Sequence, residues 1–253
     1  MSSDGLSGQI TVDVADLIRL IDKTRFAISN EETRYYLNGL YLHTVGEGAA
    51  AKLRAVATDG HRLALAEMPA PEGAAGLPGV IVPRKTVQEV RRLIEDAGET
   101  VDLQLSASKV RLAFGRAALT SKVIDGSFPD YGRVIPKDNN RVLTVDNAVF
   151  ASAVDRVATI SAEKSRSVKV AIEPGRMTLT VRNMEAGQAV EELEADYDGE
   201  AFEIGFNARY LLDVAGQVQG DTAEFRFADP ASPTLVLDAS DPAVQYVLMP
   251  LRV

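Results

Sequence analysis

Apolar and polar residues alternate along most of this 253-residue chain, which is the pattern of β-strands with one buried face. In 101–105 the sequence Val-Asp-Leu-Gln-Leu places its apolar residues on one side, and 110–114 repeats this pattern after a serine-rich turn. The same alternation is present in 177–181 and in 223–227. These segments predict strands that each cover a hydrophobic core.

Four short segments follow a helical period instead. They begin after Asp13, near Pro83, after Asp146 and after Asn207, which are residue types common at helix starts. Many strands with a few short helices favour an α+β fold. The side chains expected to form the buried stripes of these helices are Leu17, Leu20, Ile21 and Thr24, then Val87, Val90 and Ile94, then Val149, Ala153, Val154 and Val157, and finally Leu211, Leu212 and Val214.

The order of these elements occurs twice along the chain. Thr-Val-Asp at 11–13 precedes one helix, and the same three residues at 144–146 precede another. Prolines and turn-forming residues interrupt regular structure near 130–140. We therefore predict two copies of one domain, spanning 1–130 and 131–253.

The composition is that of an ordinary globular protein, with 46% hydrophobic and 25% charged residues. No apolar run approaches the roughly 20 residues of a membrane span. The first nine residues are small and polar, so we expect no secretory signal and a cytoplasmic location. The absence of cysteine excludes disulfides and thiolate metal sites.

Few residues could support catalysis or metal binding, because the chain has two histidines and none of the common nucleotide, hydrolase or zinc-protease motifs. A hydrolase centred on Asp59 and His61 is conceivable, but Asp-Gly at 59–60 favours a turn. A metal at His43 and His61 lacks a supporting carboxylate spacing. An acidic cluster could hold Mg²⁺ or could be a solvated strand face. Its members are Glu191, Glu192, Glu194 and Asp196.

The charge balance, 27 basic against 36 acidic residues, argues against a protein that holds DNA by bulk attraction. However, the predicted helices hold many of the cations, while segments such as 191–200 are acidic. At 34–36, an arginine beside two tyrosines suits a phosphate and a base or sugar, although a solvated helix face with two sheet tyrosines is the simpler explanation of the same residues. The helix cations are Arg19, Lys23, Arg25, Arg84, Lys85, Arg91, Arg92, Arg156 and Arg209.

Five motifs, in order along the chain, resemble the bacterial DNA polymerase III β subunit, the sliding clamp. They are Arg-Tyr-Tyr-Leu-Asn-Gly at 34–39, Ala-Thr-Asp-Gly-His-Arg-Leu-Ala at 57–64, Ile-Val-Pro-Arg-Lys at 81–85, Phe-Pro-Asp-Tyr at 128–131 and Tyr-Val-Leu-Met-Pro-Leu-Arg-Val at 246–253. The resemblance covers the second and third domains of that family. The family's first domain is missing from the match, because the chain starts shortly before the first predicted helix.

The resemblance implies the DNA clamp fold, in which each domain packs two short helices on two small antiparallel sheets. Six such domains form a ring around duplex DNA, with helices inward and sheets outward. Basic helices would then give a mild attraction to phosphate, while an acidic outer surface avoids DNA. Because the ring is held topologically, few phosphate contacts are needed, which answers the objection from net charge.

The resemblance also implies a groove, formed between the two domains, that binds a short peptide containing Leu and Phe. Apolar residues such as Leu63 and Met249 would accept an oily side chain, and Arg62 would belong to a polar rim. Ala231, Pro233 and Ser165 depart from the family pattern and affect fine specificity. The implied groove residues are Leu37, Thr58, Gly60, His61, Arg62, Leu63, Pro129, Arg133, Val134, Asn207, Tyr210, Met249, Pro250, Leu251 and Arg252. The implied DNA-contacting residues are Arg34, Tyr35, Tyr36, Arg84, Lys85, Lys164 and Arg166.

The family's partners would be double-stranded DNA, the catalytic subunit of the replicative polymerase, the clamp loader, translesion polymerases and mismatch-repair proteins. The chain would have no catalytic residues and no cofactor, and would act on the nucleoid in the cytoplasm. Self-association is also open, as a weak dimer or a ring-forming trimer, beside a monomer. A different class remains as an alternative, namely a peptide-binding module that never encircles DNA.

Overall fold

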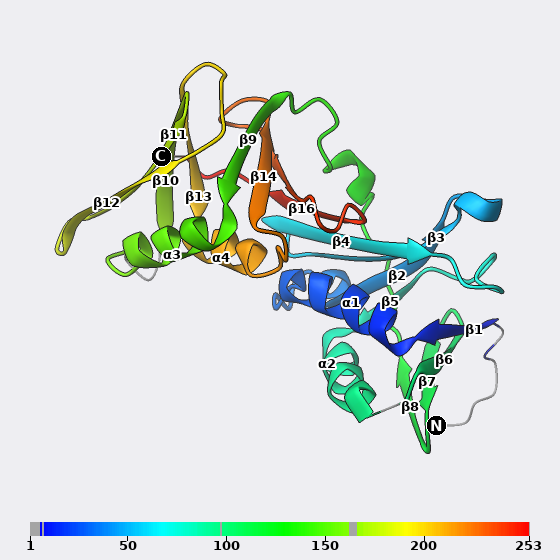
Figure 1. The fold of residues 1–253 in the computed structure, drawn as a ribbon. Helices are drawn as coiled ribbons and strands as arrows, with labels where there is room; N and C mark the ends of the chain where they lie inside the picture. Colours follow the sequence, from blue (N-terminus) through cyan, green and yellow to red (C-terminus); the bar gives the residue numbers. More distant parts are fainter. Residues whose placement is uncertain (1–5, 7, 97, 162–165, 253) are drawn as a thin grey trace. The chain divides into compact units, whose positions relative to one another are not determined.

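The computed structural model describes residues 6, 8–96, 98–161 and 166–252 of the chain, which divides into two compact units, Met1–Pro129 and Asp130–Val253. Among the described residues, each unit contains two α-helices and eight β-strands, and the strand pairs within a unit are antiparallel. Figure 1 shows the elements of each unit, with α1 beside α2 and α3 beside α4. The α+β fold predicted from the sequence is confirmed.

In the first unit, strands pair in the orders β1-β6-β7-β8 and β5-β2-β3-β4, and both helices pack on them. The strands are β1 (Gly8–Asp13), β2 (Gly39–Val45), β3 (Lys52–Thr58), β4 (Arg62–Pro69), β5 (Val80–Pro83), β6 (Thr100–Leu105), β7 (Lys109–Phe114) and β8 (Ala117–Lys122), and the helices are α1 (Val14–Thr24) and α2 (Arg84–Leu93).

The second unit has the same element order and equivalent pairings, β9-β14-β15-β16 and β13-β10-β11-β12. Its strands are β9 (Arg141–Asp146), β10 (Ser167–Glu173), β11 (Arg176–Asn183), β12 (Gly187–Glu194), β13 (Phe202–Asn207), β14 (Thr222–Phe227), β15 (Thr234–Asp238) and β16 (Val244–Leu248), and its helices are α3 (Asn147–Ala158) and α4 (Ala208–Ala215). The internal repeat predicted from the order of elements is therefore present.

Most residues of the predicted helix stripes are buried, although Leu212 of α4 is only half-buried and the stripe of α3 differs by one residue. Ala153, Val154 and Val157 are buried as expected, whereas Val149 is 50% exposed and Phe150, at 1%, takes its place. The reason is the cap: the Asp146 carboxylate accepts a hydrogen bond from the Val149 N–H at 2.8 Å. This places Val149 in the first turn, facing outward, so that the stripe runs i, i+3, i+4, i+7 from Phe150.

The starts of the helices also differ in chemistry. Asn207 caps α4 by accepting from the Arg209 N–H at 2.9 Å, as its residue type suggests. Asp13, expected to cap α1, makes no such side-chain bond; the Val14 N–H donates instead to the carbonyl of Glu99 at 2.8 Å. The Glu99 carbonyl thus satisfies an N–H group at the start of α1, as the side chain of a capping residue would. None of the helices in the described ranges combines the length and apolar character of a membrane span.

Candidate functional site

The motif at 58–63 forms a tight connection between β3 and β4, which we call the β3–β4 turn (residues 58–62). The Asp59 carboxylate accepts hydrogen bonds from the His61 and Arg62 N–H groups at 2.9 and 3.0 Å. The Thr58 hydroxyl donates to the Arg62 carbonyl at 2.6 Å. Gly60 has φ +88°, which a residue with a side chain rarely adopts. Asp59 and Thr58 are therefore used as turn-forming groups, which supports the turn interpretation of the motif over a hydrolase centre.

Arg62 and Leu63 anchor this turn to the interior of the first unit. Arg62 is 7% exposed; it pairs with Asp59 at 3.2 Å and donates to the Phe26 carbonyl at 2.8 Å. Its guanidinium lies 5.2 Å from the centre of the Phe26 ring, within cation–π range. Leu63 and Leu37 are 2% and 3% exposed. Arg62 thus supports the turn from the interior of the first unit.

The predicted DNA residues of the first unit come partly together at the start of α2. An open depression of about 630 Å³ contains Tyr35, which is 53% exposed, together with Arg84 and Lys85. Tyr36 packs edge-on against Tyr35, with ring centres 5.8 Å apart. The remaining lining residues are Asn38, Pro83, Gln88, Glu89 and Ile124.

Arg34 belongs to a different neighbourhood. Its guanidinium pairs with Glu31 at 2.8 Å and donates to the carbonyl of Asp59 at 3.0 Å. The motif Arg34-Tyr35-Tyr36 is therefore divided by the structure, because the arginine faces the β3–β4 turn while Tyr35 faces the depression beside α2.

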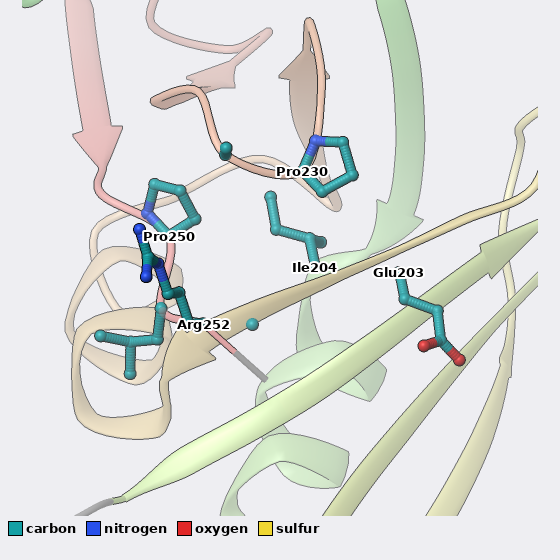
Figure 2. A pocket seen from close by; sticks show the side chains of 8 residues that line it. Glu203, Ile204, Pro230, Pro250 and Arg252 are labelled. Atoms are coloured by element: carbon teal, nitrogen blue, oxygen red, sulfur yellow. The ribbon is translucent and has the colours of Figure 1, made fainter.

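Within the C-terminal motif of the second unit, residues 249–252 follow β16 and form an extended segment beside β13. The Leu251 N–H donates to the carbonyl of Gly205 at 2.8 Å, and Met249, just before it, is 36% exposed. Figure 2 shows the pocket next to this segment, whose volume is about 490 Å³. Predicted residues Pro250, Leu251 and Arg252 line it, together with Glu203, Ile204, Gly205, Pro230 and Ala231. No sequence motif indicated Glu203 or Pro230 as pocket residues, because they belong to β13 and to the loop after β14, which are separate from the C-terminal motif in the sequence.

The other predicted groove residues have less specific surroundings. Asn207 is used as the α4 cap, and Tyr210 lies in the first turn of α4, half-buried. Pro129 ends the first unit and is exposed. At the start of the second unit, Arg133 pairs with Asp130 at 2.9 Å, and Val134 is 39% exposed.

The basic helix faces are largely neutralised by neighbouring carboxylates. Arg91 pairs with Asp22 and Glu95, and Arg156 pairs with Glu191. Further pairs of this kind join Arg25 to Asp22, Arg92 to Glu89 and Arg209 to Asp213. Within the described ranges, Arg84 and Lys85 have no ion pair, so they are better placed to meet a phosphate.

Of the two residues of the second unit that were predicted to contact DNA, the structure describes Arg166. Arg166 has φ +35°, and its carbonyl accepts from the Ala208 N–H at 2.8 Å. Together with Arg209 it lines a depression of about 380 Å³ between α3 and α4, which also contains Asp155 and Asp213. Lys164, also predicted to contact DNA, and Ser165 lie outside the described residues.

No group of three or more histidine, aspartate or glutamate side chains in the described part of the chain has the geometry of a metal site. Of the acidic cluster, Glu191 pairs with Arg156 and Glu192 lies 3.9 Å from Arg176. The backbone of Asp196 exchanges hydrogen bonds with Thr144. The cluster is thus a strand surface with ion pairs, as the solvated-face interpretation proposed.

His43 packs in β2 with its ring stacked on Tyr41, the ring centres 4.1 Å apart. Burial, followed by the nearby Arg54 guanidinium, lowers the pKa of His43 from 6.5 to about 4. Between these pH values the unfolded chain binds a proton that the folded chain excludes. The contribution of neutral His43 to the free energy of unfolding is therefore fully present above pH 6.5 and is lost as the pH falls toward 4.

Between pH 7.5 and 4.5, the free energy of unfolding should fall by about 2 kcal/mol less in His43→Gln than in wild type. This value allows for partial solvent access to the ring. Urea unfolding at pH 7.5 and 4.5 measures the difference for wild type and variant. His61→Gln, at an exposed histidine, is the control and should retain the wild-type difference. An equal loss in wild type and His43→Gln would contradict the assignment.

Comparisons with known proteins agree with this architecture. Residues 11–130 match the family model of the central domain of the DNA polymerase III beta subunit, and residues 132–252 match its C-terminal domain. The beta sliding clamp of Caulobacter vibrioides is 80% identical over 253 residues, which are all of this chain and 68% of that protein. The Escherichia coli beta sliding clamp is 37% identical, covering 96% of this chain and 65% of that protein.

Solved structures show the same similarity. A DNA polymerase sliding clamp from Caulobacter crescentus superimposes with a TM-score of 0.96 at 79% identity, covering 100% of this chain and 68% of that one. A sliding clamp from Bartonella birtlesii, bound to griselimycin, gives 0.97 at 48% identity, again covering 100% and 68%. The class defined by the repeated fold is that of DNA clamps. The chain belongs to the DNA polymerase III beta subunit family, the bacterial beta sliding clamps.

Proposed function

We propose that residues 1–130 and 131–253 act as the middle and C-terminal domains of a sliding clamp that tethers polymerases to duplex DNA. The tether is a groove that binds a short peptide containing Leu and Phe. The observation that carries this proposal is the exposed Met249 beside the extended segment Pro250–Arg252 and its pocket. An apolar side chain next to backbone in extended form suits a linear peptide with one oily anchor.

The chemistry of the groove residues supports binding and no reaction. Met249 and Val134 are exposed, apolar and, in the case of methionine, adaptable in shape. Thr58 is occupied within its own turn, as is the neighbouring Asp59, which is not one of the groove residues. We therefore assign the chain no catalytic residues and no cofactor. The proposed partners are the replicative polymerase, the clamp loader, translesion polymerases and mismatch-repair proteins, all acting on DNA in the cytoplasm.

Uneven charge supports DNA binding at the first unit. Residues 1–129 contain fifteen basic and sixteen acidic side chains, whereas 130–253 contain twelve and twenty. The first unit is therefore close to neutral, and its Arg84 and Lys85, which form no ion pair with any described residue, lie beside an exposed tyrosine. Such a site gives weak, sequence-independent contacts with phosphate, which permit sliding.

Replacing Arg84 and Lys85 together by alanine should weaken duplex binding and reduce the slope of log K against log salt by about 2, since two phosphate contacts are lost. Fluorescence anisotropy with labelled duplex at several salt concentrations measures this slope. Arg116→Ala, at an exposed cation of the same unit, should leave it unchanged. An unaltered slope in the double variant would rule out this site.

The alternative, a peptide-binding module that does not encircle DNA, makes a different prediction for DNA topology. Encirclement requires self-association of the chain, which the like edges of its two repeats make possible. The full chain is incubated with nicked circular DNA and with the same DNA linearised. Retention on the circle alone supports encirclement, and equal behaviour on both supports the binding module.

A further inference from the structure

Arg34 lies over the outer side of the β3–β4 turn. Its Nε and Nη2 atoms reach the same Glu31 oxygen at 2.9 and 2.8 Å, and Nη2 also donates to the Asp59 carbonyl at 3.0 Å. Its Nη1 occupies the space above Gly60, where a Cβ atom would lie only 2.3 Å away. The guanidinium is thus in contact with the turn along one whole edge, and Glu31 orients it from the other side.

The turn is consequently held from two directions. On the inner side, the Asp59 carboxylate and the buried Arg62 tie it to Phe26. On the outer side, Arg34 binds the carbonyl that immediately precedes Gly60. The inner contacts belong to the core of the first unit, whereas Arg34 is about one-third exposed. Loss of Arg34 should therefore loosen the outer half of the turn without unfolding the unit.

We propose that Arg34 is a positioning residue for peptide binding: it holds the Asp59–Gly60 peptide unit so that His61 is presented in one conformation. This inference rests on the proposed groove, in which Thr58, Gly60 and His61 are wall residues. It also moves Arg34 from the DNA-contacting set to the peptide-binding set. Glu31, which sequence analysis did not single out, becomes the residue that orients Arg34.

The physical basis is preorganisation. Gly60 at φ +88° has wide conformational freedom in an unrestrained turn. A peptide that binds a mobile turn must order it, and that cost appears as weaker affinity. The planar guanidinium can bind a carboxylate and a carbonyl together, which the single ammonium of lysine does less well. Arg34→Lys should therefore restore the function only in part.

The test compares Arg34→Ala, Arg34→Lys and the control Arg116→Ala in the full chain. The probe is a short fluorescein-labelled peptide that contains Leu and Phe, and its affinity is measured by fluorescence anisotropy. Arg34→Ala should weaken peptide binding about five- to tenfold, with Arg34→Lys between it and wild type. Amide hydrogen exchange should accelerate at Gly60 and His61 but not in β12, and the melting temperature should stay within about 2 °C of wild type.

Duplex affinity separates this role from a DNA contact, and it should not change in Arg34→Ala. Wild-type peptide affinity in that variant, or a loss of duplex affinity as large as in the variant with both Arg84 and Lys85 replaced by alanine, would overturn the inference. If the wild-type chain binds no peptide, the proposed groove fails. In that case the exchange of Gly60 and His61 still tests the positioning role, and unchanged exchange in Arg34→Ala refutes it.

Discussion

Met249→Lys should weaken binding of the Leu- and Phe-containing peptide at least about 30-fold, which corresponds to about 2 kcal/mol. Met249 follows β16 and is 36% exposed, so a lysine there can keep its ammonium in water while the chain remains folded. When a peptide side chain covers this position, the charge must lose water without gaining a partner. The penalty therefore falls on the complex and not on the free chain.

Anisotropy titrations of wild type and Met249→Lys measure this loss, with thermal melting as a check on folding. Met184→Lys is the matched control, because Met184 is fully exposed between β11 and β12 in the same unit. It introduces the same charge at the same residue type and should leave the peptide affinity unchanged. Equal affinities for Met249→Lys and wild type would exclude Met249 from the groove.

Leu63→Glu should have its largest effect on stability, lowering the free energy of unfolding by at least about 3 kcal/mol. Leu63 is 2% exposed in β4, opposite Thr58 of β3. A carboxylate in this position must either lose its hydration or force the strand pair apart. A loss of peptide binding in this variant would therefore report unfolding of the first unit as much as a change in the groove.

Urea unfolding followed by circular dichroism tests this expectation. Ala117→Glu, which adds the same charge at an exposed position of β8, should unfold close to wild type. Leu63→Met should also remain folded, because it preserves volume and hydrophobicity. An unfolding midpoint for Leu63→Glu equal to that of wild type would show that this site reaches solvent without cost.

Local periodicity predicted much of the fold. Val87, Val90 and Ile94 form the buried stripe of α2 and its continuation, and the alternation in 101–105 is that of β6. The error at Val149 arose because an apolar residue in the first turn of a helix looks like part of the stripe until the cap is known. The phase of α3 became clear only with the bond from Asp146 to the Val149 N–H.

Site residues were harder to place than elements, because the sequence does not record which partner a charged side chain will choose. Arg34 and Arg84 were both expected to face DNA. In the structure Arg34 binds Glu31 and Asp59, whereas Arg84 lines an open depression. Arg62 was expected in the polar rim of the groove, and in the structure it is buried over Phe26. In each case the deciding neighbour is set by the packing around it.

From its residues alone, this chain revealed two repeated α+β domains and the motifs of a sliding clamp, because residue period and contiguous motifs are local properties. Tertiary structure decided which described cations pair with carboxylates, which apolar residues stay exposed, and that Glu31, Arg34 and the β3–β4 turn are in contact with one another. Those outcomes depend on contacts between segments up to dozens of residues apart. Burial and ion pairing are properties of such contacts and become defined only when the chain has folded.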